Sequence, residues 1–251
     1  MTRIITALVL IPLVVWVVLV GPPWALLTIM ALVGLVAFHE FDTMAGAQGI
    51  AKSGFLGLTA GLLFLFAPGP LWIAILAAAV VLMAFLAKSK SLTSAATALL
   101  GVVYIFGAWR YALGLRLMNP HWLMIALLVS WAGDTAALYV GRAFGRHKLA
   151  PRVSPSKTWE GSIGSVVGGV AAAGVYAHFL IPSAALWLVL IVAAAGNIAG
   201  QVGDLCESAF KRRAGVKDSG TTLPGHGGWL DRIDSSLFSI PVVYALLKVL
   251  I

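Results

Sequence analysis

The feature that most constrains this chain is a series of apolar segments that recurs along nearly its whole length. An α-helix needs about 20 apolar residues to cross the hydrocarbon core of a bilayer. Period-2 alternation is absent, so membrane-spanning β-strands are not expected. The chain is therefore predicted to be an all-α, polytopic integral membrane bundle with about nine transmembrane helices, the third of them short. These segments are residues 4–20, 23–38, 55–66, 71–87, 97–117, 122–140, 161–180, 184–203 and 234–251.

No soluble domain, low-complexity linker or internal repeat separates these segments. We therefore expect residues 1–251 to form a single membrane-embedded domain. Residues 1–100 would provide packing spans, with dimerisation as a further role, and residues 101–251 would form the catalytic half. Small residues at four-residue spacing let helices approach closely in a membrane. They favour packing within one chain, a dimer face being the alternative, and they occur at Gly57/Gly61, Gly161/Ser165/Gly169 and Gly196/Gly200.

The connections between the apolar segments are of two alternating kinds. Four are short, uncharged and contain proline, whereas residues 39–54, 88–96, 141–160 and 204–233 are longer and charged. Of the 17 Lys and Arg residues, 14 lie in these charged connections or at the N-terminus. Because Lys and Arg collect on the cytoplasmic side during insertion, the charged connections are predicted to be cytoplasmic. The same topology explains the net charge of +8, so a nucleic-acid partner is not expected, although a phosphate-rich small substrate is compatible with it.

The stretch from residue 204 to 234 differs in composition from the rest of the chain. Only 10% of all residues are charged, yet this stretch holds five of the nine acidic residues. If the preceding helix continues into it, Asp204, Glu207, Ser208 and Lys211 share one helical face. Asp231 and Asp234 have the same three-residue spacing at the start of the last segment. Two acidic helix ends joined by a glycine-rich loop would bring Asp204 and Asp231 together.

This composition predicts a polar site that faces water, a solvated surface loop being the alternative. Clustered carboxylates are hard oxygen ligands that suit Mg²⁺, which also binds substrate phosphates. The turn that contains Gly227 and Gly228 would offer backbone N–H groups to an anion. The cations expected to neutralise a polyphosphate and its leaving group are Lys211, Arg212, Lys217 and Arg232.

Asp134 lies inside an otherwise apolar segment. An ionisable side chain near the bilayer centre costs at least about 2.5–3.5 kcal/mol on insertion scales, so such a residue usually faces a polar cavity or a partner. Asp134 is expected to line a substrate or metal cavity, and a structural ion pair with Arg110 or Arg142 is the alternative.

The segment Ser154-Pro-Ser-Lys-Thr-Trp-Glu-Gly161 combines hydroxyls, an ammonium and a carboxylate at the start of a helix. The helix is predicted to begin at Ser156 or Lys157, with Glu160 in its first turn, where the helix dipole favours a negative group. The same positive helix end suits a phosphate. The alternative is a helix cap with cations at the membrane surface.

One long pattern runs from Ser208 to Asp234. It reads Ser208-Ala-Phe-Lys-Arg212, then Lys217-Asp-Ser-Gly-Thr-Thr-Leu-Pro-Gly-His-Gly-Gly228, and, after Trp229, Leu230-Asp-Arg-Ile-Asp234. This pattern resembles the signature of phosphatidate cytidylyltransferases, also called CDP-diacylglycerol synthases, apart from Trp229, where an aliphatic residue or phenylalanine is more usual. Three further segments resemble other blocks of that family: 133–139, 141–145 and 154–161.

The resemblance implies transfer of CMP from CTP to phosphatidic acid, which yields CDP-diacylglycerol and pyrophosphate. It implies Mg²⁺, alone or with a second ion that is divalent or monovalent, and it implies that Asp204 and Asp231 are the metal ligands. It also implies a homodimer in the lipid bilayer of the cell inner (cytoplasmic) membrane, with the active site facing the cytoplasm. Such a reaction needs no activated serine or cysteine, because the lipid phosphate is already a nucleophile.

The expected site follows from the pattern and the resemblance together. Catalytic residues are Asp204, Asp231, Lys211, Arg212, Lys217, Asp218, His226 and Arg232, with His226 as a phosphate or cytidine contact rather than a general base. Substrate-binding residues are Asp134, Ser154, Lys157, Thr158, Glu160, Glu207, Ser208, Gly227, Gly228 and Asp234. An ion-coupled secondary transporter or cation channel that uses intramembrane aspartates is the alternative function. The position of the acidic cluster at the membrane ends argues against it.

Overall fold

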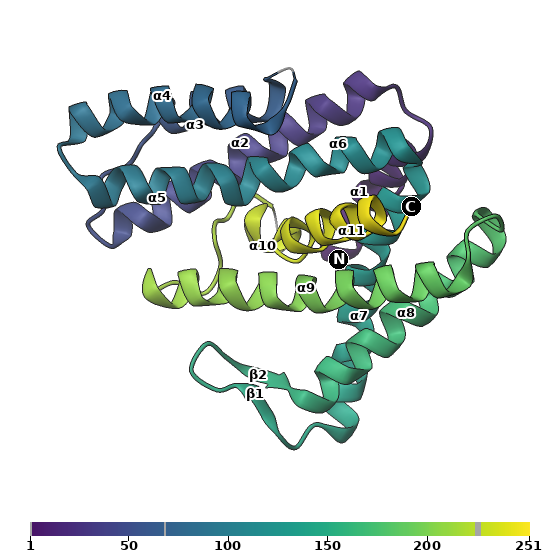
Figure 1. The fold of residues 1–251 in the computed structure, drawn as a ribbon. Helices are drawn as coiled ribbons and strands as arrows, with labels where there is room; N and C mark the ends of the chain where they lie inside the picture. Colours follow the sequence, from purple (N-terminus) through teal and green to yellow (C-terminus); the bar gives the residue numbers. More distant parts are fainter. Residues whose placement is uncertain (1, 68, 224–226) are drawn as a thin grey trace. The chain divides into compact units, whose positions relative to one another are not determined.

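The chain is almost entirely helical in the computed structural model, which describes residues 2–67, 69–223 and 227–251 (Figure 1). Its N-terminal helices are α1 (Thr2–Leu19), α2 (Pro23–Ala47), α3 (Phe55–Phe66), α4 (Leu71–Ser89), α5 (Leu92–Val102), the π-helix η1 (Val103–Gly107) and α6 (Ala108–Met118). The C-terminal helices are α7 (Pro120–Phe144), α8 (Trp159–Leu180), α9 (Leu186–Arg213), α10 (Leu230–Ile233) and α11 (Ser236–Leu250). The strands β1 (Lys148–Ala150) and β2 (Ser154–Thr158) lie between α7 and α8.

Each predicted apolar segment is helical, and seven helices of the described residues are long and apolar enough to cross a membrane. Two apolar helices are shorter, Leu8–Leu19 and Phe55–Phe66. The all-α polytopic architecture is therefore confirmed, and the short third segment is a helix of 12 residues. The seven long spans are Pro23–Ala47, Leu71–Ser89, Leu92–Met118, Pro120–Phe144, Trp159–Leu180, Leu186–Arg213 and Leu230–Leu250.

Contacts divide the chain into two compact units. The first unit comprises Met1–Val17, Gly21–Leu113 and Phe210–Ile233. The second unit comprises Val18–Val20, Gly114–Ala209 and Asp234–Ile251. The acidic stretch that begins at Asp204 is therefore divided between the two units, and α9 contributes residues to both.

An aromatic cluster joins α2, η1 and the last turn of α9 in the first unit. The ring centroids of Phe38 and Phe106 are 5.9 Å apart, and both side chains are fully buried. Phe41 meets Phe210 edge to face, with centroids 5.4 Å apart. Such aromatic pairs contribute about 0.5–1.5 kcal/mol beyond the burial of their area. The cluster therefore holds the C-terminal part of α2 beside the end of α9.

Arg110 has a structural role in the first unit, although it interrupts an apolar segment. Its guanidinium donates hydrogen bonds to the carbonyl oxygens of Phe64 and Ala67 at 3.0 Å each and of Gly69 at 2.9 Å. The last carbonyl groups of a helix lack partners within the helix and carry partial negative charge. A cation at this position therefore stabilises the C-terminal end of α3.

Small residues let α7 and α8 pack closely in the second unit. A Cβ added at Gly169 would lie 2.8 Å from the carbonyl oxygen of Val129, and one added at Gly168 would overlap the Cβ of Ala136. Asn197 of α9 fastens the same region, since its amide nitrogen donates to the Val129 carbonyl at 2.8 Å. The expectation that the small residues of 161–169 serve packing within one chain is confirmed.

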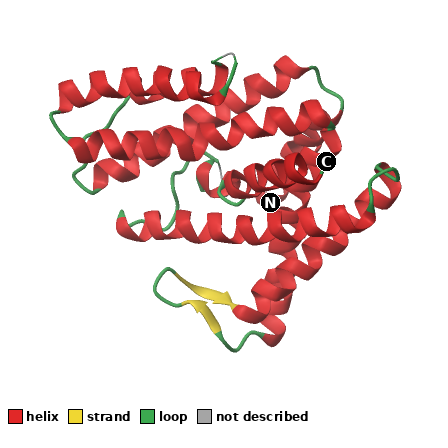
Figure 2. Ribbon diagram, in the orientation of Figure 1, coloured by secondary structure: helices red, strands yellow, loops and turns green. Residues whose placement is uncertain are grey.

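The connection between α7 and α8 is an antiparallel β-hairpin (Figure 2), which the sequence analysis did not predict. Lys148 pairs with Thr158, and Ala150 pairs with Ser154. The strands are only three and five residues long, so they carry too little period-2 pattern to be recognised. The hairpin nevertheless determines where Lys157 is presented.

The start of α8 also differs from the prediction. Ser156 and Lys157 are extended in β2, and α8 begins at Trp159. Thr158 is the N-cap, because its hydroxyl accepts the N–H of Gly161 at 3.1 Å. The prediction of a start at Ser156 or Lys157 was therefore wrong, since the backbone there pairs in the hairpin, whereas the place of Glu160 in the first turn is confirmed.

We predict that Gly168→Ala destabilises the protein, because the new methyl group would overlap Ala136, which has no flexible side chain to move away. Overpacking of this kind costs about 1–3 kcal/mol. For a chain of this length, that cost corresponds to a melting temperature lower by roughly 2–10 °C. The measurement is thermal unfolding of detergent-solubilised protein, followed by size-exclusion chromatography after heating.

Gly174→Ala is the matched control, because it lies on the same helix and its added Cβ would come no closer than 3.7 Å to a side-chain atom of Leu190. This variant should be at least as stable as the wild type, since alanine is the better helix former. Equal melting temperatures for the two variants would show that the close packing of α7 and α8 is not a source of stability.

Candidate functional site

The helix α9 continues into the acidic stretch, which is the condition under which its polar residues share one helical face. It ends at Arg213 and carries Asp204, Glu207, Ser208 and Lys211 in its last three turns. Glu207 is fully buried, whereas the side chain of Asp204 is 28% exposed. Asp204 therefore presents a carboxylate that is partly accessible to solvent.

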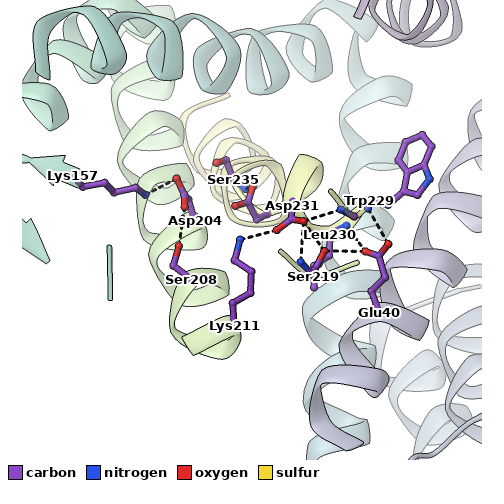
Figure 3. A network of polar contacts seen from close by, with 12 residues as sticks. Glu40, Lys157, Asp204, Ser208, Lys211, Ser219, Trp229, Leu230, Asp231 and Ser235 are labelled. Carbon is purple, nitrogen blue, oxygen red and sulfur yellow. Dashed lines mark hydrogen bonds and ion pairs between the residues drawn. The ribbon is translucent and has the colours of Figure 1, made fainter. Parts of the chain in front are cut away.

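Asp204, Lys157 and Ser208 form a cluster in the second unit, named here the Asp204 cluster (Figure 3). The ammonium of Lys157, on β2, lies 2.5 Å from Asp204 Oδ2. The hydroxyl of Ser208, one turn further along α9, donates to Asp204 Oδ1 at 3.3 Å. Both partners of Asp204 are thus side chains, and both are residues that the sequence analysis assigned to substrate binding.

Asp231, Lys211, Ser219 and Gly228 form a second cluster, in the first unit, named here the Asp231 cluster (Figure 3). Asp231 Oδ1 lies 2.7 Å from the ammonium of Lys211, and the two side chains are 5% and 13% exposed. Asp231 Oδ2 accepts the N–H of Gly228 at 2.8 Å and the N–H of Ser219 at 2.9 Å. One carboxylate oxygen is therefore held by the backbone, and the other is directed to a cation.

Two glycines let the backbone approach carboxylates closely, Gly227 at Asp231 and Gly228 at Glu40. Gly227 has φ +80°, in the left-handed region that favours glycine, and an added Cβ would lie 2.7 Å from Asp231 Oδ2. A Cβ at Gly228 would lie 2.5 Å from an oxygen of Glu40. In this conformation, the Gly228 N–H binds Asp231, so the expected anion-binding group of the turn is used within the protein.

Glu160 holds the base of the hairpin in the second unit. Its carboxylate accepts the N–H groups of Arg146 at 3.1 Å and His147 at 3.2 Å, and it lies 2.6 Å from His147 Nδ1. Ser154 pairs with Ala150 in the same hairpin. The contacts of Glu160 are therefore those of a residue that fixes the strand presenting Lys157.

The remaining predicted residues have varied environments. Asp134 is exposed on α7, whereas Asp234 is buried and accepts the N–H of Ser235 at 2.7 Å. His226 lies outside the described residues, and its assigned contact stays a prediction. Exposed side chains around the two clusters are Arg212, Lys217, Asp218 and Arg232.

Glu40 is a residue of this region that the sequence analysis missed. It lies on α2, is only 4% exposed, and accepts hydrogen bonds from the segment that precedes Asp231 (Figure 3). The prediction ended the second apolar segment at residue 38, whereas α2 continues to Ala47. An acidic residue that extends an apolar helix pattern was the available signal, but its partner cannot be identified from that pattern.

The donor set bears on whether a metal ion can bind. Among the described residues, no group of three or more His, Cys, Asp or Glu side chains is arranged to hold a metal ion. Mg²⁺ is commonly held by one or two carboxylates together with water and substrate phosphates. Asp204 Oδ2 and Asp231 Oδ1 are hard oxygen donors that now bind ammonium groups. Each of these carboxylates fits a cation that is held jointly with phosphate rather than by protein ligands alone.

Comparison with known proteins assigns the chain to a family. Residues 1–250 match the model of the Cytidylyltransferase family. A phosphatidate cytidylyltransferase of Staphylococcus saprophyticus subsp. saprophyticus is 41% identical over 176 residues, which are 69% of this chain and 68% of that protein. The phosphatidate cytidylyltransferase of Staphylococcus haemolyticus is 42% identical over 176 residues, with the same two shares. The one from Staphylococcus aureus (strain COL) is 34% identical over 228 residues, 86% of this chain and 87% of that protein. The chain therefore belongs to the cytidylyltransferase family.

Proposed function

We propose that this protein transfers CMP from CTP to phosphatidic acid, giving CDP-diacylglycerol and pyrophosphate. The observation that carries the proposal is the Asp231 cluster, in which the signature segment holds a carboxylate by backbone N–H groups and directs it to Lys211. Membership of the family and the names of its relatives support the two substrates. Helices long and apolar enough to cross a membrane support a reaction at a membrane, where the lipid substrate resides.

The reaction forms one P–O bond and breaks another. An oxygen of the lipid phosphate attacks the α-phosphorus of CTP, and the bond from that phosphorus to the bridging oxygen breaks. The electron pair of the broken bond leaves with pyrophosphate. Because the nucleophile is already an anion, the protein must hold two mutually repelling anions in line and stabilise charge on the leaving group.

Lys157 and Lys211 suit these tasks. Each ammonium is partly or largely buried and neutralises one carboxylate. A triphosphate would offer each ammonium further oxygen acceptors, and buried cations stabilise developing negative charge more strongly than cations in water. We assign both lysines to phosphate binding and the exposed Arg212, Lys217 and Arg232 to electrostatic attraction of CTP.

We assign Asp204 and Asp231 to Mg²⁺ binding. When bound, Mg²⁺ supplies charge neutralisation to the phosphates and to the departing pyrophosphate. Each aspartate must offer an oxygen to the ion while its other hydrogen bonds are kept. Asp231 can do so, because its Oδ2 accepts two backbone N–H groups. Whether a second ion joins Mg²⁺ and whether the protein is a homodimer stay predictions.

We place the reaction at the cytoplasmic face of the inner membrane. The hairpin before α8 carries Lys148, Arg152 and Lys157, whereas the connection after α8, residues 181–185, carries no charged residue. Lys and Arg near the ends of spans favour the cytoplasmic side. CTP is a cytoplasmic nucleotide, so this orientation gives it access to the cationic connections.

The substrates required for turnover test the proposed reaction. Protein purified in detergent should convert labelled CTP to a lipid-linked CMP product only when phosphatidic acid and Mg²⁺ are both present, because Asp204 and Asp231 each offer hard oxygen donors beside a lysine. Diacylglycerol, which lacks the phosphate nucleophile, should give no product. Equal turnover of ATP or UTP would contradict cytidylyl specificity.

The variant Asp231→Asn tests the role of Asp231 in the reaction. An asparagine can turn its carbonyl oxygen to the Ser219 and Gly228 N–H groups, so the loop should stay folded, but the amide cannot pair with Lys211 or bind a cation well. The variant should lose activity by about a hundredfold or more, the magnitude expected when a preorganised electrostatic group is removed. Turnover of CTP and the size-exclusion profile are the measurements.

Asp42→Asn is the matched control for this variant. Asp42 is also a buried aspartate of the first unit whose carboxylate accepts backbone N–H groups, from Ser53 at 3.0 Å and Gly54 at 2.9 Å. It has no assigned role in the reaction, so the control should keep wild-type turnover per folded molecule. An active Asp231→Asn variant would remove Asp231 from the catalytic set.

Labelling of single cysteines tests which connections face the cytoplasm. Cys206 is the one natural cysteine, so Cys206→Ala gives the background. Arg152→Cys in the hairpin and Ser183→Cys in the opposite connection both replace exposed residues. In intact cells, an impermeant maleimide should label position 183 but label position 152 only after the membrane is permeabilised. The reverse pattern would overturn the cytoplasmic assignment.

A further inference from the structure

Glu40 is a buried acceptor surrounded by four donors. Its Oε1 accepts the hydroxyl of Thr222 at 2.5 Å and the N–H of Trp229 at 3.1 Å. Its Oε2 accepts the N–H of Leu230 at 2.9 Å and lies 3.1 Å from the hydroxyl of Ser219. An ionised carboxylate has only acceptor positions, about four of them, so four converging donors match it.

The donors lie in the described residues 219–223 and 227–230 of one segment, 179 to 190 positions along the chain from Glu40. The N–H groups of Trp229 and Leu230 stand at the start of α10, where a helix leaves its first donors without partners of its own. Glu40 of α2 supplies acceptors for these two donors. A side chain of one helix therefore caps the beginning of another in the first unit.

The segment approaches the carboxylate so closely that glycine is needed at two positions. An added Cβ would lie 2.5 Å from Glu40 Oε2 at Gly228 and 2.7 Å from Oε1 at Gly220. Both distances are shorter than real Cβ contacts. The backbone at Gly220 and at Gly228 therefore lies close against the Glu40 carboxylate.

The same segment holds Asp231. Ser219 donates its N–H to Asp231 Oδ2 at 2.9 Å, and its hydroxyl lies 3.0 Å from that atom and 3.1 Å from Glu40 Oε2. A hydroxyl has one proton, so it donates to one of the two carboxylates at a time. Gly228, where an added Cβ would meet Glu40, gives its N–H to Asp231. Ser219 and Gly228 thus adjoin Glu40 and also hold Asp231.

We propose that Glu40 is a positioning residue, which holds residues 219–223 and 227–230 in the conformation that presents Asp231 for the reaction. Glu40 acts through this segment and has no contact with substrate. The kinetic part of the proposal rests on the proposed function, whereas the order of the segment can be measured without any substrate.

The variant Glu40→Gln tests the hydrogen-bond acceptors of Glu40 without a change in the shape of the side chain. Glu40→Gln keeps the size of the side chain but replaces one oxygen by an NH₂ donor. In either orientation of the amide, this NH₂ group faces the N–H of Trp229 or of Leu230. A hydroxyl can rotate to accept a hydrogen bond, but a backbone N–H cannot, so each orientation leaves donors facing each other.

The test compares Glu40→Gln with Asp42→Asn, which lies on the same helix two residues away and also removes half of a buried carboxylate. Hydrogen–deuterium exchange of detergent-solubilised protein, without substrate or metal, is read on peptides that cover residues 219–231 and 50–56. Glu40→Gln should accelerate exchange in 219–231 by about tenfold or more, the size of effect expected from lost charge-assisted hydrogen bonds. Asp42→Asn should accelerate exchange only in 50–56.

Kinetics add a readout that a general loss of stability would not change. Per folded molecule, Glu40→Gln should lower kcat by about tenfold or more and raise the Mg²⁺ concentration needed for half-maximal turnover, because Asp231 is less well oriented. Asp42→Asn should keep both values. Wild-type exchange in 219–231 of Glu40→Gln, or equal kinetic losses in both variants, would overturn the proposal.

A second variant covers the case in which Glu40→Gln does not fold. Thr222→Val alters an exposed residue and removes one donor to Glu40 Oε1. It should accelerate exchange in 219–231 by about threefold, and unchanged exchange would count against the proposal. If wild-type protein failed to turn over CTP with phosphatidic acid, the proposed function would fail, while the exchange data would still decide whether Glu40 orders the segment.

Discussion

A backbone N–H group outside a helix has no partner within its own element and must find an acceptor elsewhere, and leaving it unpaired is most costly where the group is buried. This requirement explains how the acidic residues of the chain are used. Acidic residues bind the backbone of three connections of the described chain: the hairpin, the turn after α2 and the segment before α10. At each of these places, a carboxylate accepts backbone N–H groups, and the residues concerned are Glu160, Asp42, Glu40 and Asp231. The charged residues therefore build the polar connections as well as bind partners in them.

The two proposed metal ligands, Asp204 and Asp231, differ in how their carboxylates are held. Asp204 contacts the side chains of Lys157 and Ser208, and both can rotate to other partners. Asp231 is held on one side by backbone groups of Ser219 and Gly228, which cannot rotate away without moving the chain. The direction of the Asp231 carboxylate is consequently a property of the fold. Its dependence on residues 219–230 makes the packing of that segment part of the site.

The sequence predicted those features that depend on local pattern. Apolar segments marked the helices, and the shared face of Asp204, Ser208 and Lys211 was expected on the condition, now met, that the helix continues past residue 203. Features that depend on distant partners were missed. Glu40 was assigned to a charged connection because hydropathy falls at residue 39, yet α2 continues past it and its partners lie at least 179 positions away. The hairpin was missed because strands of three and five residues have almost no periodicity.

In the proposed reaction, the buried pair of Asp231 and Lys211 would couple the binding of the cation to the binding of the nucleotide. A cation that takes Asp231 Oδ1 must displace an ammonium that is only 13% exposed. An ammonium left without a partner in such surroundings is costly, and so is a carboxylate left alone. The exchange would become favourable if a phosphate accepted hydrogen bonds from Lys211 while the cation bound Asp231. Binding of the nucleotide and of the cation would then be mutually reinforcing, since each ligand supplies the partner that the other displaces. A metal bound without nucleotide would be held weakly for the same reason.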